Sequence, residues 1–284
     1  MFAAVNTKDP TAVEVQVQAA YLAMYPQGDL YWVPKVFGWA IECFTGHYKD
    51  YLPIDARYHD FEHTLQGTLC LSRLLLGRHR AGAQPHLPQR LFELGIIAIL
   101  MHDTGYLKHR WDQEGTGAKY TLIHVQRSTE FAAQLMAEKG FDTEDIIGVR
   151  NMIRCTGVNV DLRAIPFQSD IEREVGFCLG TADLLGQMAA VDYIDKLPIL
   201  YSEFAESARQ HSGQGSSTGL FSSAEDLIRK TPGFWENYVL PKLAKDFENV
   251  SRYLNDPQPE GTNPYVATIH SNIQQLKSSL AAAA

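Results

Sequence analysis

Apolar residues recur at three- and four-residue spacing through most of this chain, which is the period of an amphipathic α-helix. Alternating apolar and polar positions, which would indicate strands, are scarce. Turn-forming sequences rich in Gly, Pro and Asp separate the helical segments near residues 26–29, 139–142 and 256–259. The pattern predicts an all-α protein with helices over residues 11–24, 31–45, 61–76, 89–103, 119–138, 143–154, 170–188, 190–208, 234–254 and 264–280.

The chain has 284 residues, enough for one large domain with a substantial core. We expect a single compact helical domain over residues 51–256, an N-terminal helical extension over residues 1–50 packed on it, and a C-terminal helix and tail over residues 257–284. One segment, residues 211–223, is rich in Gly and Ser and is predicted to be a mobile loop. A surface insertion and a lid over a functional site both fit that composition.

Composition and charge narrow the class of protein. Apolar residues make up 45% of the chain and the net charge is −8, with no basic tract, which argues against binding to a nucleic-acid polymer. The four cysteines are scattered and do not predict a disulfide framework. Neither a signal peptide nor an apolar run long enough to span a membrane is visible. We therefore expect a cytoplasmic protein that has no membrane partner.

Two short histidine-rich segments carry candidate chemistry, residues 58–63 (YHDFEH) and 101–105 (MHDTG). The second follows the apolar run 94–100, so His102 and Asp103 stand where a buried helix would otherwise continue. Burying an imidazole and a carboxylate is costly unless the two are paired or bind a metal ion. The glycine that follows, Gly105, lets the backbone turn close to a ligand. This segment predicts a metal site.

Further metal ligands come from other predicted helices. His59 and His63 are four residues apart, on one face of a predicted helix that Asp60 could cap. Asp183 is a charge inside an apolar segment, and His124 is either a further ligand or a hydrogen-bonded, half-buried histidine. His and Asp side chains suit Zn, Mn, Fe or Co, and a carboxylate can bridge two ions. The set of predicted metal ligands is His63, His102, Asp103, Asp183 and His124, the last for a second ion.

Four segments in this order resemble the HD-domain superfamily of metal-dependent phosphohydrolases, and within it the class I cyclic nucleotide phosphodiesterases. RYHDFEHTLQGTL (57–69) is similar to their YHNxxHAxDV segment, and AILMHDTGY (98–106) to their apolar-HD segment. GTADLLGQ (180–187) is similar to their late aspartate segment, and TPGFWENYVLPKL (231–243) to their QxGFxxxxxxPL segment. The resemblance implies an HD-type catalytic domain over residues 51–256.

The resemblance also implies roles for single residues. His59 would be the general acid that protonates the leaving oxygen, and Asp103 would bridge two divalent ions (Mn, Mg, Zn or Fe) that activate a hydroxide. The remaining first-ion ligands would be His63, His102 and Asp183. Phe234 would match an aromatic clamp on a nucleotide base. The implied reaction is hydrolysis of a small phosphodiester or phosphomonoester, with nucleotides among the substrates.

Three departures from the family pattern weaken the substrate assignment. Asp60 replaces the Asn after the first histidine, and Tyr106 replaces the second histidine of HDxxHPG. Thr231 stands at the position of the glutamine that reads a purine edge, so it cannot make a bidentate amide contact. Cations that could hold the phosphate include Arg154 and Lys196. Other residues predicted near the pocket are Glu62, which could orient His59, and Trp111.

Two other functions stay open. A di-iron oxygenase on the same fold would need two more histidines. His124 could be one of them, but near the position expected for the other the sequence has Cys155 and no histidine. A non-catalytic nucleotide sensor would usually lack a ligand, whereas all four first-ion ligands are present. Residues 1–50 could pack on the catalytic helices or form a homodimer contact.

Overall fold

The helices predicted from the apolar pattern are present in a computed structural model of the chain, which describes residues 4–158, 160–211 and 221–282. The described residues form ten α-helices and no β-strand, so the all-α prediction is confirmed for them. The helices are α1 (Pro10–Met24), α2 (Trp32–Phe44), α3 (Phe61–Arg80), α4 (Gln89–Met101), α5 (His124–Glu138), α6 (Thr143–Arg154), α7 (Asp170–Met188), α8 (Tyr193–His211), α9 (Ala224–Phe234) and α10 (Pro264–Ala282).

Shorter helical turns connect some of these helices. Four are 3₁₀ turns: η1 (Thr104–Tyr106), η2 (Gly117–Tyr120), η3 (Leu162–Ala164) and η6 (Val250–Leu254). Two are π-helical, η4 (Trp235–Val239) and η5 (Lys242–Asp246), and they continue the direction of α9. The turn η1 directly follows α4 and His102-Asp103, so it lies beside the predicted metal ligands.

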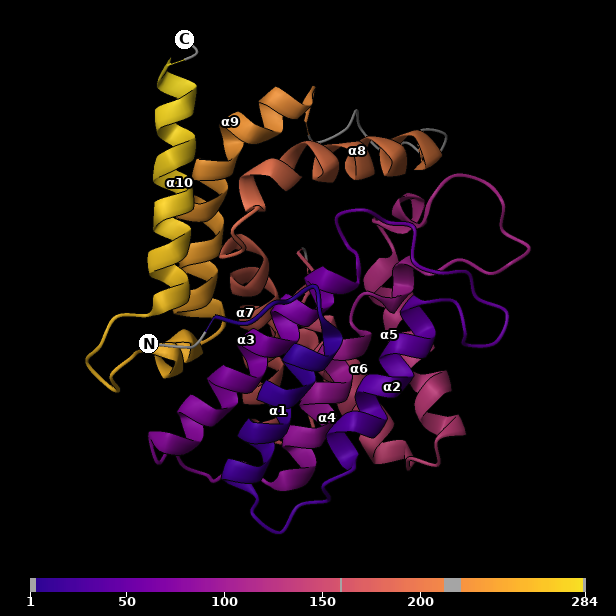
Figure 1. Cartoon of the computed structure of the whole chain (residues 1–284), viewed down its shortest axis with the longest axis vertical. Coiled ribbons are helices and arrows are strands. Elements are labelled where there is room, and N and C mark those ends of the chain that lie inside the picture. The colour runs from indigo at the N-terminus through magenta and orange to yellow at the C-terminus, as the bar shows by residue number, and fades with distance from the viewer. Residues whose placement is uncertain (1–3, 159, 212–220, 283–284) are drawn as a thin grey trace.

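The centre of the molecule is the pair α3 and α7, which pack along each other (Figure 1). Helix α3 is buried on nearly every face between His63 and Gly77, and α4 is buried continuously from Phe92 to Met101. Helices with so little exposed surface must lie inside the bundle. Helices α1, α4 and α6 cover this pair, and α5 packs on α6. Polar side chains on α3, α4 and α7 are therefore brought into the interior.

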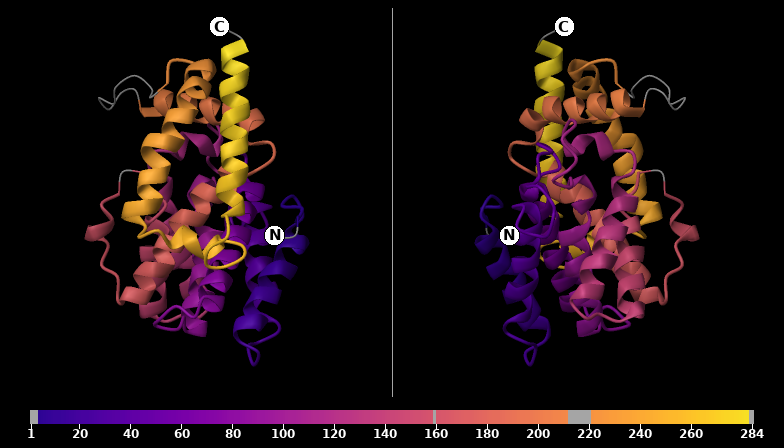
Figure 2. Two further views of the ribbon diagram at one scale, coloured as in Figure 1. Left: turned by 90° about the vertical axis from the view of Figure 1, so that its left-hand side faces the viewer. Right: turned by 90° about the vertical axis from the view of Figure 1, so that its right-hand side faces the viewer.

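Helices α1 and α2 contribute to the same hydrophobic core as the central helices, through residues such as Val17, Tyr21 and Phe37. Helix α10 packs along α9 and also touches α7, and its C-terminal end projects beyond the other helices (Figures 1 and 2). The domain boundaries at residues 50 and 256 stay predictions. None of the described helices is long and apolar enough to cross a membrane.

The structure differs from the predicted helices at two places. The helix predicted from residue 119 begins at His124, because residues 117–120 form a separate 3₁₀ turn whose Thr116 side chain accepts a hydrogen bond from Ala118 N. The helix predicted from residue 234 begins ten residues earlier, at Ala224, where the Ser223 side chain caps it by accepting from Asp226 N. It continues past Pro232 into the two π-helical turns, and the chain then turns at Glu248 and Asn249, which have positive φ.

The predicted Gly/Ser-rich loop over 211–223 falls mostly outside the described residues, since 212–220 are among those not described. Helix α8 extends through His211, and α9 starts just after Ser223. The role of this loop stays a prediction.

Candidate metal centre

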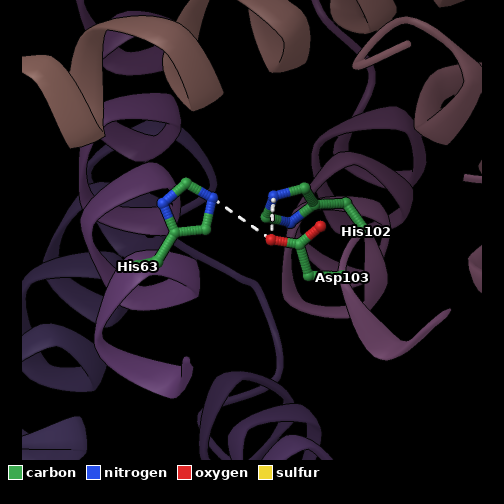
Figure 3. Close-up of side chains that lie close together, drawn as sticks. All are labelled: His63, His102 and Asp103. Atoms are coloured by element: carbon green, nitrogen blue, oxygen red, sulfur yellow. Dashed lines mark ion pairs between the residues drawn. The ribbon is translucent and has the colours of Figure 1, made fainter. Parts of the chain in front are cut away.

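Three predicted ligands lie close together in the interior, one in α3 and two directly after the end of α4. The Nε2 atoms of His63 and His102 each lie 3.2 Å from Oδ2 of Asp103, so one carboxylate oxygen points between the two imidazoles (Figure 3). The potential ligand atoms of the three residues all lie within 4.8 Å of one another, and all three side chains are buried. The prediction that these side chains lie together is met.

Asp183 completes the group from a third helix. Its Oδ1 lies 3.2 Å from Nε2 of His63 and 3.5 Å from Nε2 of His102, on α7 facing α3. The side-chain amide of Gln187, one turn further along α7, donates to the same Oδ1 at 3.3 Å, and Tyr58 Oη donates to the amide oxygen of Gln187 at 2.8 Å. These bonds hold the Asp183 carboxylate toward the imidazoles.

Close packing of α3 against α7 brings Asp183 to His63. A Cβ atom on Gly186 would lie 2.9 Å from the backbone of Gln66 and Gly67, so only glycine permits this approach.

His63 stands in the first turn of α3, where the Asp60 carboxylate caps the helix by accepting a hydrogen bond from His63 N at 2.9 Å. The predicted cap is confirmed, whereas His59 precedes the helix and does not share a helical face with His63.

A second close approach brings His124 to the same centre. A Cβ on Gly105 would lie 2.0 Å from the backbone oxygen of His124, so glycine lets η1 pack against the start of α5. The sequence predicted that Gly105 lets the backbone turn close to a ligand, but the close approach is to the backbone of His124. The Nε2 atom of His124 lies 3.8 Å from Oδ1 of Asp103, the oxygen that does not face His63 and His102. The two oxygens of Asp103 therefore face different histidines.

Backbone carbonyls fix the orientation of two of these rings. The Nδ1 atom of His102 lies 2.7 Å from the carbonyl oxygen of Ile99, and Nδ1 of His124 lies 2.6 Å from that of Thr121. A carbonyl can only accept, so Nδ1 carries a proton in each ring and donates it. The Nε2 atom is then left to face Asp103, which is the arrangement typical of histidines that bind metal ions.

The two histidines and the two carboxylates shift one another's pKa values. Burial would lower the pKa of His63, but the adjacent carboxylates of Asp103 and Asp183 raise it to about 9. The pKa of His102 is likewise raised, against burial, by the same carboxylates. Burial would raise the pKa of Asp103 and Asp183, but the adjacent imidazoles hold both well below the usual range. Without an ion, protons on the histidines neutralise the carboxylates.

The donor set fits a divalent metal ion. Nε2 of His102 and Oδ2 of Asp103 are buried atoms without a hydrogen-bond partner among the described residues, although they face each other. Two ligand atoms about 2.1 Å from a common ion lie about 3.0 Å apart at octahedral and about 3.4 Å apart at tetrahedral angles. Three of the four distances are 3.2 Å, inside that range, and the fourth is 3.5 Å, just above it. Burial lowers the pKa of His124, which favours the neutral imidazole that a metal ion requires.

Beside this group, His59 is held by a residue that the sequence did not indicate. Its Nδ1 lies 2.6 Å from Oε2 of Glu203 on α8, and the other oxygen of that carboxylate accepts from Arg57 N and Tyr58 N at 2.7 Å each. The predicted partner, Glu62, instead forms an ion pair of 3.0 Å with Lys196. Glu203 lies 144 positions along the chain from His59, so spacing could not indicate the pair.

A tyrosine packs against both His59 and His124. The ring of Tyr106 stacks on His59, with centroids 4.6 Å apart, and on His124, with centroids 4.7 Å apart. The two imidazoles also lie beside each other, with centroids 6.1 Å apart. Tyr106 is the residue that replaces the second histidine of the HDxxHPG pattern, and its fully buried ring helps to hold both imidazoles in place.

The predicted substrate contacts have a mixed outcome. Lys196 lines a small cavity together with His63, Tyr58, Gln66, Gln187 and Tyr193, so it lies close to the predicted ligands. Phe234 is 39% exposed and stacks on Tyr238 at 5.0 Å. Thr231 is buried, and its hydroxyl donates to the carbonyl of Leu227 in its own helix, so it is not free to read a base. Arg154 makes a long hydrogen bond of 3.4 Å to Asn151.

Comparison with known proteins identifies a family for this chain. The family model described as Npun_R2479-like matches residues 13–279, which is nearly the whole chain. No curated protein matches the chain.

Proposed function

The chain belongs to the Npun_R2479-like family, and we propose that it is a metal-dependent phosphohydrolase of the HD type. The observation that carries this proposal is that the buried carboxylates of Asp103 and Asp183 both face the Nε2 atoms of His63 and His102. Two of its buried atoms, His102 Nε2 and Asp103 Oδ2, lack a hydrogen-bond partner among the described residues, and a bound ion would satisfy both. The resemblance of four sequence segments to HD-domain phosphohydrolases supports the same function.

Two ions would share the Asp103 carboxylate. The first would be held by His63, His102, Asp183 and Oδ2 of Asp103, and the second by Oδ1 of Asp103 and His124. When bound, divalent ions lower the pKa of a coordinated water and neutralise charge on phosphoryl oxygens. Gln187 keeps the Asp183 carboxylate directed at the first position, and the Ile99 carbonyl does the same for His102.

His59 would act as the general acid. Glu203 occupies its Nδ1, so Nε2 is the nitrogen available to donate a proton to the leaving oxygen of a phosphoester. Stacking on Tyr106 holds the ring in place, and the His59 side chain is 15% exposed, so a substrate can reach it.

The proposed substrate is a small phosphodiester or phosphomonoester, with nucleotides among those to be tested. Phe234 offers a partly exposed aromatic ring, and Lys196 is a cation beside His63. Because the Thr231 hydroxyl is already bonded to Leu227, recognition of a purine edge at this position is not part of the proposal.

Metal content and hydrolysis, measured together on the untagged protein, test the proposal. Elemental analysis would be paired with a panel of bis-p-nitrophenyl phosphate, p-nitrophenyl phosphate, cyclic nucleotides and nucleoside monophosphates. We expect about two Mn, Zn or Mg ions per chain and hydrolysis of at least one ester. Two tightly held iron ions without ester hydrolysis would favour the di-iron oxygenase instead. Cys155, near the expected further histidine of that class, is buried, and its thiol donates to the Asn151 carbonyl.

A further inference from the structure

A second cavity lies outside the metal centre, between two loops and helix α5. Its volume is about 430 Å³, within the range of about 300–1,000 Å³ that is typical of small-molecule sites. The lining side chains come from residues 49–51 and 109–111, with Gln134 of α5. None of them is a candidate metal ligand. One of them, Trp111, had been predicted to lie near the active-site pocket.

An aromatic stack forms one wall of this cavity. Trp111 stacks on His109 with ring centroids 5.4 Å apart and planes 14° apart, and His109 packs on Tyr51 at 4.2 Å. Tyr51 is buried and in edge contact with Phe131 of α5. Trp111 itself is 77% exposed, so one indole face lies on His109 and the rest is open to solvent. An exposed indole in a fixed orientation is a surface on which a planar ring can stack.

The two loops are fixed to each other by backbone hydrogen bonds. Leu52 N donates to the Lys108 carbonyl at 2.8 Å, and Arg110 N donates to the Asp50 carbonyl at 2.7 Å. Lys49 has a φ of 47°, in the left-handed region that residues other than glycine rarely adopt. Strained backbone of this kind persists where surrounding contacts impose it, and it is concentrated at ligand sites. The cavity is therefore formed before any ligand binds.

The charges at the cavity favour an anion on one side. The Arg110 guanidinium donates from Nη2 to the Gly46 carbonyl at 2.9 Å and has no carboxylate partner among the described residues. Lys49 also lines the cavity but is paired with Glu138. Arg110 is thus the cation whose charge is not neutralised by an ion pair. Asp50 and Gln134 add groups that can accept hydrogen bonds from a heteroaromatic ring.

We propose that this cavity binds a planar aromatic anion, with its ring stacked on Trp111 and its phosphate or carboxylate group on Arg110. The chemistry is shared by nucleoside monophosphates and aromatic carboxylates. The site does not depend on the hydrolase function, because it shares no residue with the metal centre.

Isothermal titration calorimetry with defined probes tests the site. The full-length protein, in buffer with EDTA so that no metal-bound ligand contributes, is titrated with AMP and with 1-naphthoate. Adenosine lacks the anion and ribose 5-phosphate lacks the ring, so they separate the two contributions. The variants are Trp111→Ala and Arg110→Gln. The control is Tyr31→Ala, which removes a similarly exposed aromatic side chain elsewhere on the surface. Thermal unfolding checks that each variant is folded.

We expect at least one anionic probe to bind, with affinity at least about fivefold weaker in Trp111→Ala, since ring stacking on an aromatic side chain contributes at this level or more. Arg110→Gln should weaken the anionic probes but not adenosine, and Tyr31→Ala should change nothing. Preference for AMP or for naphthoate identifies the source of the ligand. The proposal is overturned if neither anionic probe binds at millimolar concentration, or if their affinity is the same in Trp111→Ala as in the unaltered protein.

Discussion

One oxygen of the Glu203 carboxylate, Oε2, is hydrogen-bonded to Nδ1 of His59 at 2.6 Å, and the other accepts hydrogen bonds from the backbone N–H groups of Arg57 and Tyr58. Burial would raise the pKa of Glu203, but the charge and hydrogen bond of His59 and these backbone donors lower it. The carboxylate therefore stays ionised and fixed on both sides. Helix α8 thus determines the orientation of the proposed general acid.

Glu203→Gln should slow hydrolysis without loss of metal. A neutral amide holds Nδ1 of His59 less firmly than the carboxylate does, so the ring is less well oriented. We expect kcat to fall by about 10- to 100-fold, part of the ~10²–10⁴-fold that a general acid contributes. Esters with poor leaving groups, such as alkyl phosphoesters, should lose most, and p-nitrophenyl esters least, because nitrophenolate needs little protonation. Steady-state kinetics across a series of leaving groups measures this dependence, together with the metal content.

The matched control is Glu206→Gln, one turn further along α8, where the carboxylate bonds Thr116 and not His59. This variant should keep the leaving-group dependence of the unaltered protein. If Glu203→Gln slows hydrolysis of every ester by the same factor, Glu203 has a structural role and does not act through His59.

Asp103→Asn should abolish metal binding and activity together. The side chain keeps its size, but one oxygen becomes an NH2 group and the negative charge that the histidines face is lost. We therefore expect far fewer than one ion per chain by elemental analysis and no ester hydrolysis. Asp112→Asn is the control, because Asp112 is also a buried carboxylate but pairs with Lys119 outside the centre. It should lower stability and retain the metal. Full metal occupancy in Asp103→Asn would contradict the ligand assignment.

His59→Ala should separate metal binding from turnover. His59 contacts Glu203 and Tyr106 but none of the proposed ligand atoms at ion-pair distance, so the ions should be retained. Loss of the acid should reduce kcat on alkyl phosphoesters by about 10²–10⁴-fold. Elemental analysis and kinetics on the same preparation test this, and full activity on every substrate would show that His59 is not the acid.

The sequence predicted the helices and the cluster of buried His and Asp side chains better than it predicted the contacts around that cluster. A charge inside an apolar run is visible without a structure, which is why His102, Asp103 and Asp183 stood out. The partner of His59 was predicted to be Glu62, but it is Glu203. Such long-range partners depend on how α8 crosses the bundle, which local periodicity does not encode.

The helix boundaries that failed have local causes. Ser223, Glu225 and Asp226 form an N-terminal capping sequence, but the preceding Gly/Ser-rich segment concealed it, so α9 was missed. His124 was predicted within a helix and instead begins α5, because residues 117–120 form a 3₁₀ turn first. The 3₁₀ turn thereby places Nε2 of His124 toward Asp103.

Metal affinity and metal-free stability should respond to pH in opposite directions. The pKa of His63 is raised to about 9, above its ordinary value of 6.5, so its pairing with the carboxylates stabilises the metal-free fold fully below about pH 6.5. That contribution, on the order of 3 kcal/mol, is lost as the pH rises through 9. A metal ion must displace the same proton, so its affinity should rise over this interval. In EDTA, Tm should fall from pH 7 to 9.5, while the stabilisation by added Mn²⁺ should grow. Parallel changes in both would contradict the assignment of His63.

Gly105→Ala should remove the second ion selectively. The added Cβ would meet the His124 carbonyl oxygen at 2.0 Å, so η1 and the start of α5 must move apart. His124 then withdraws from Oδ1 of Asp103, while His63 and His102 keep their positions beside Oδ2 of Asp103 and the Asp183 carboxylate. We expect elemental analysis to show a drop from two ions to one and a large loss of kcat. Gly38→Ala is the control, because a Cβ there meets nothing within 4 Å and alanine favours the helix, so this variant should keep both ions and gain up to about 1 kcal/mol of stability. Two ions retained in Gly105→Ala would show that His124 is not a ligand.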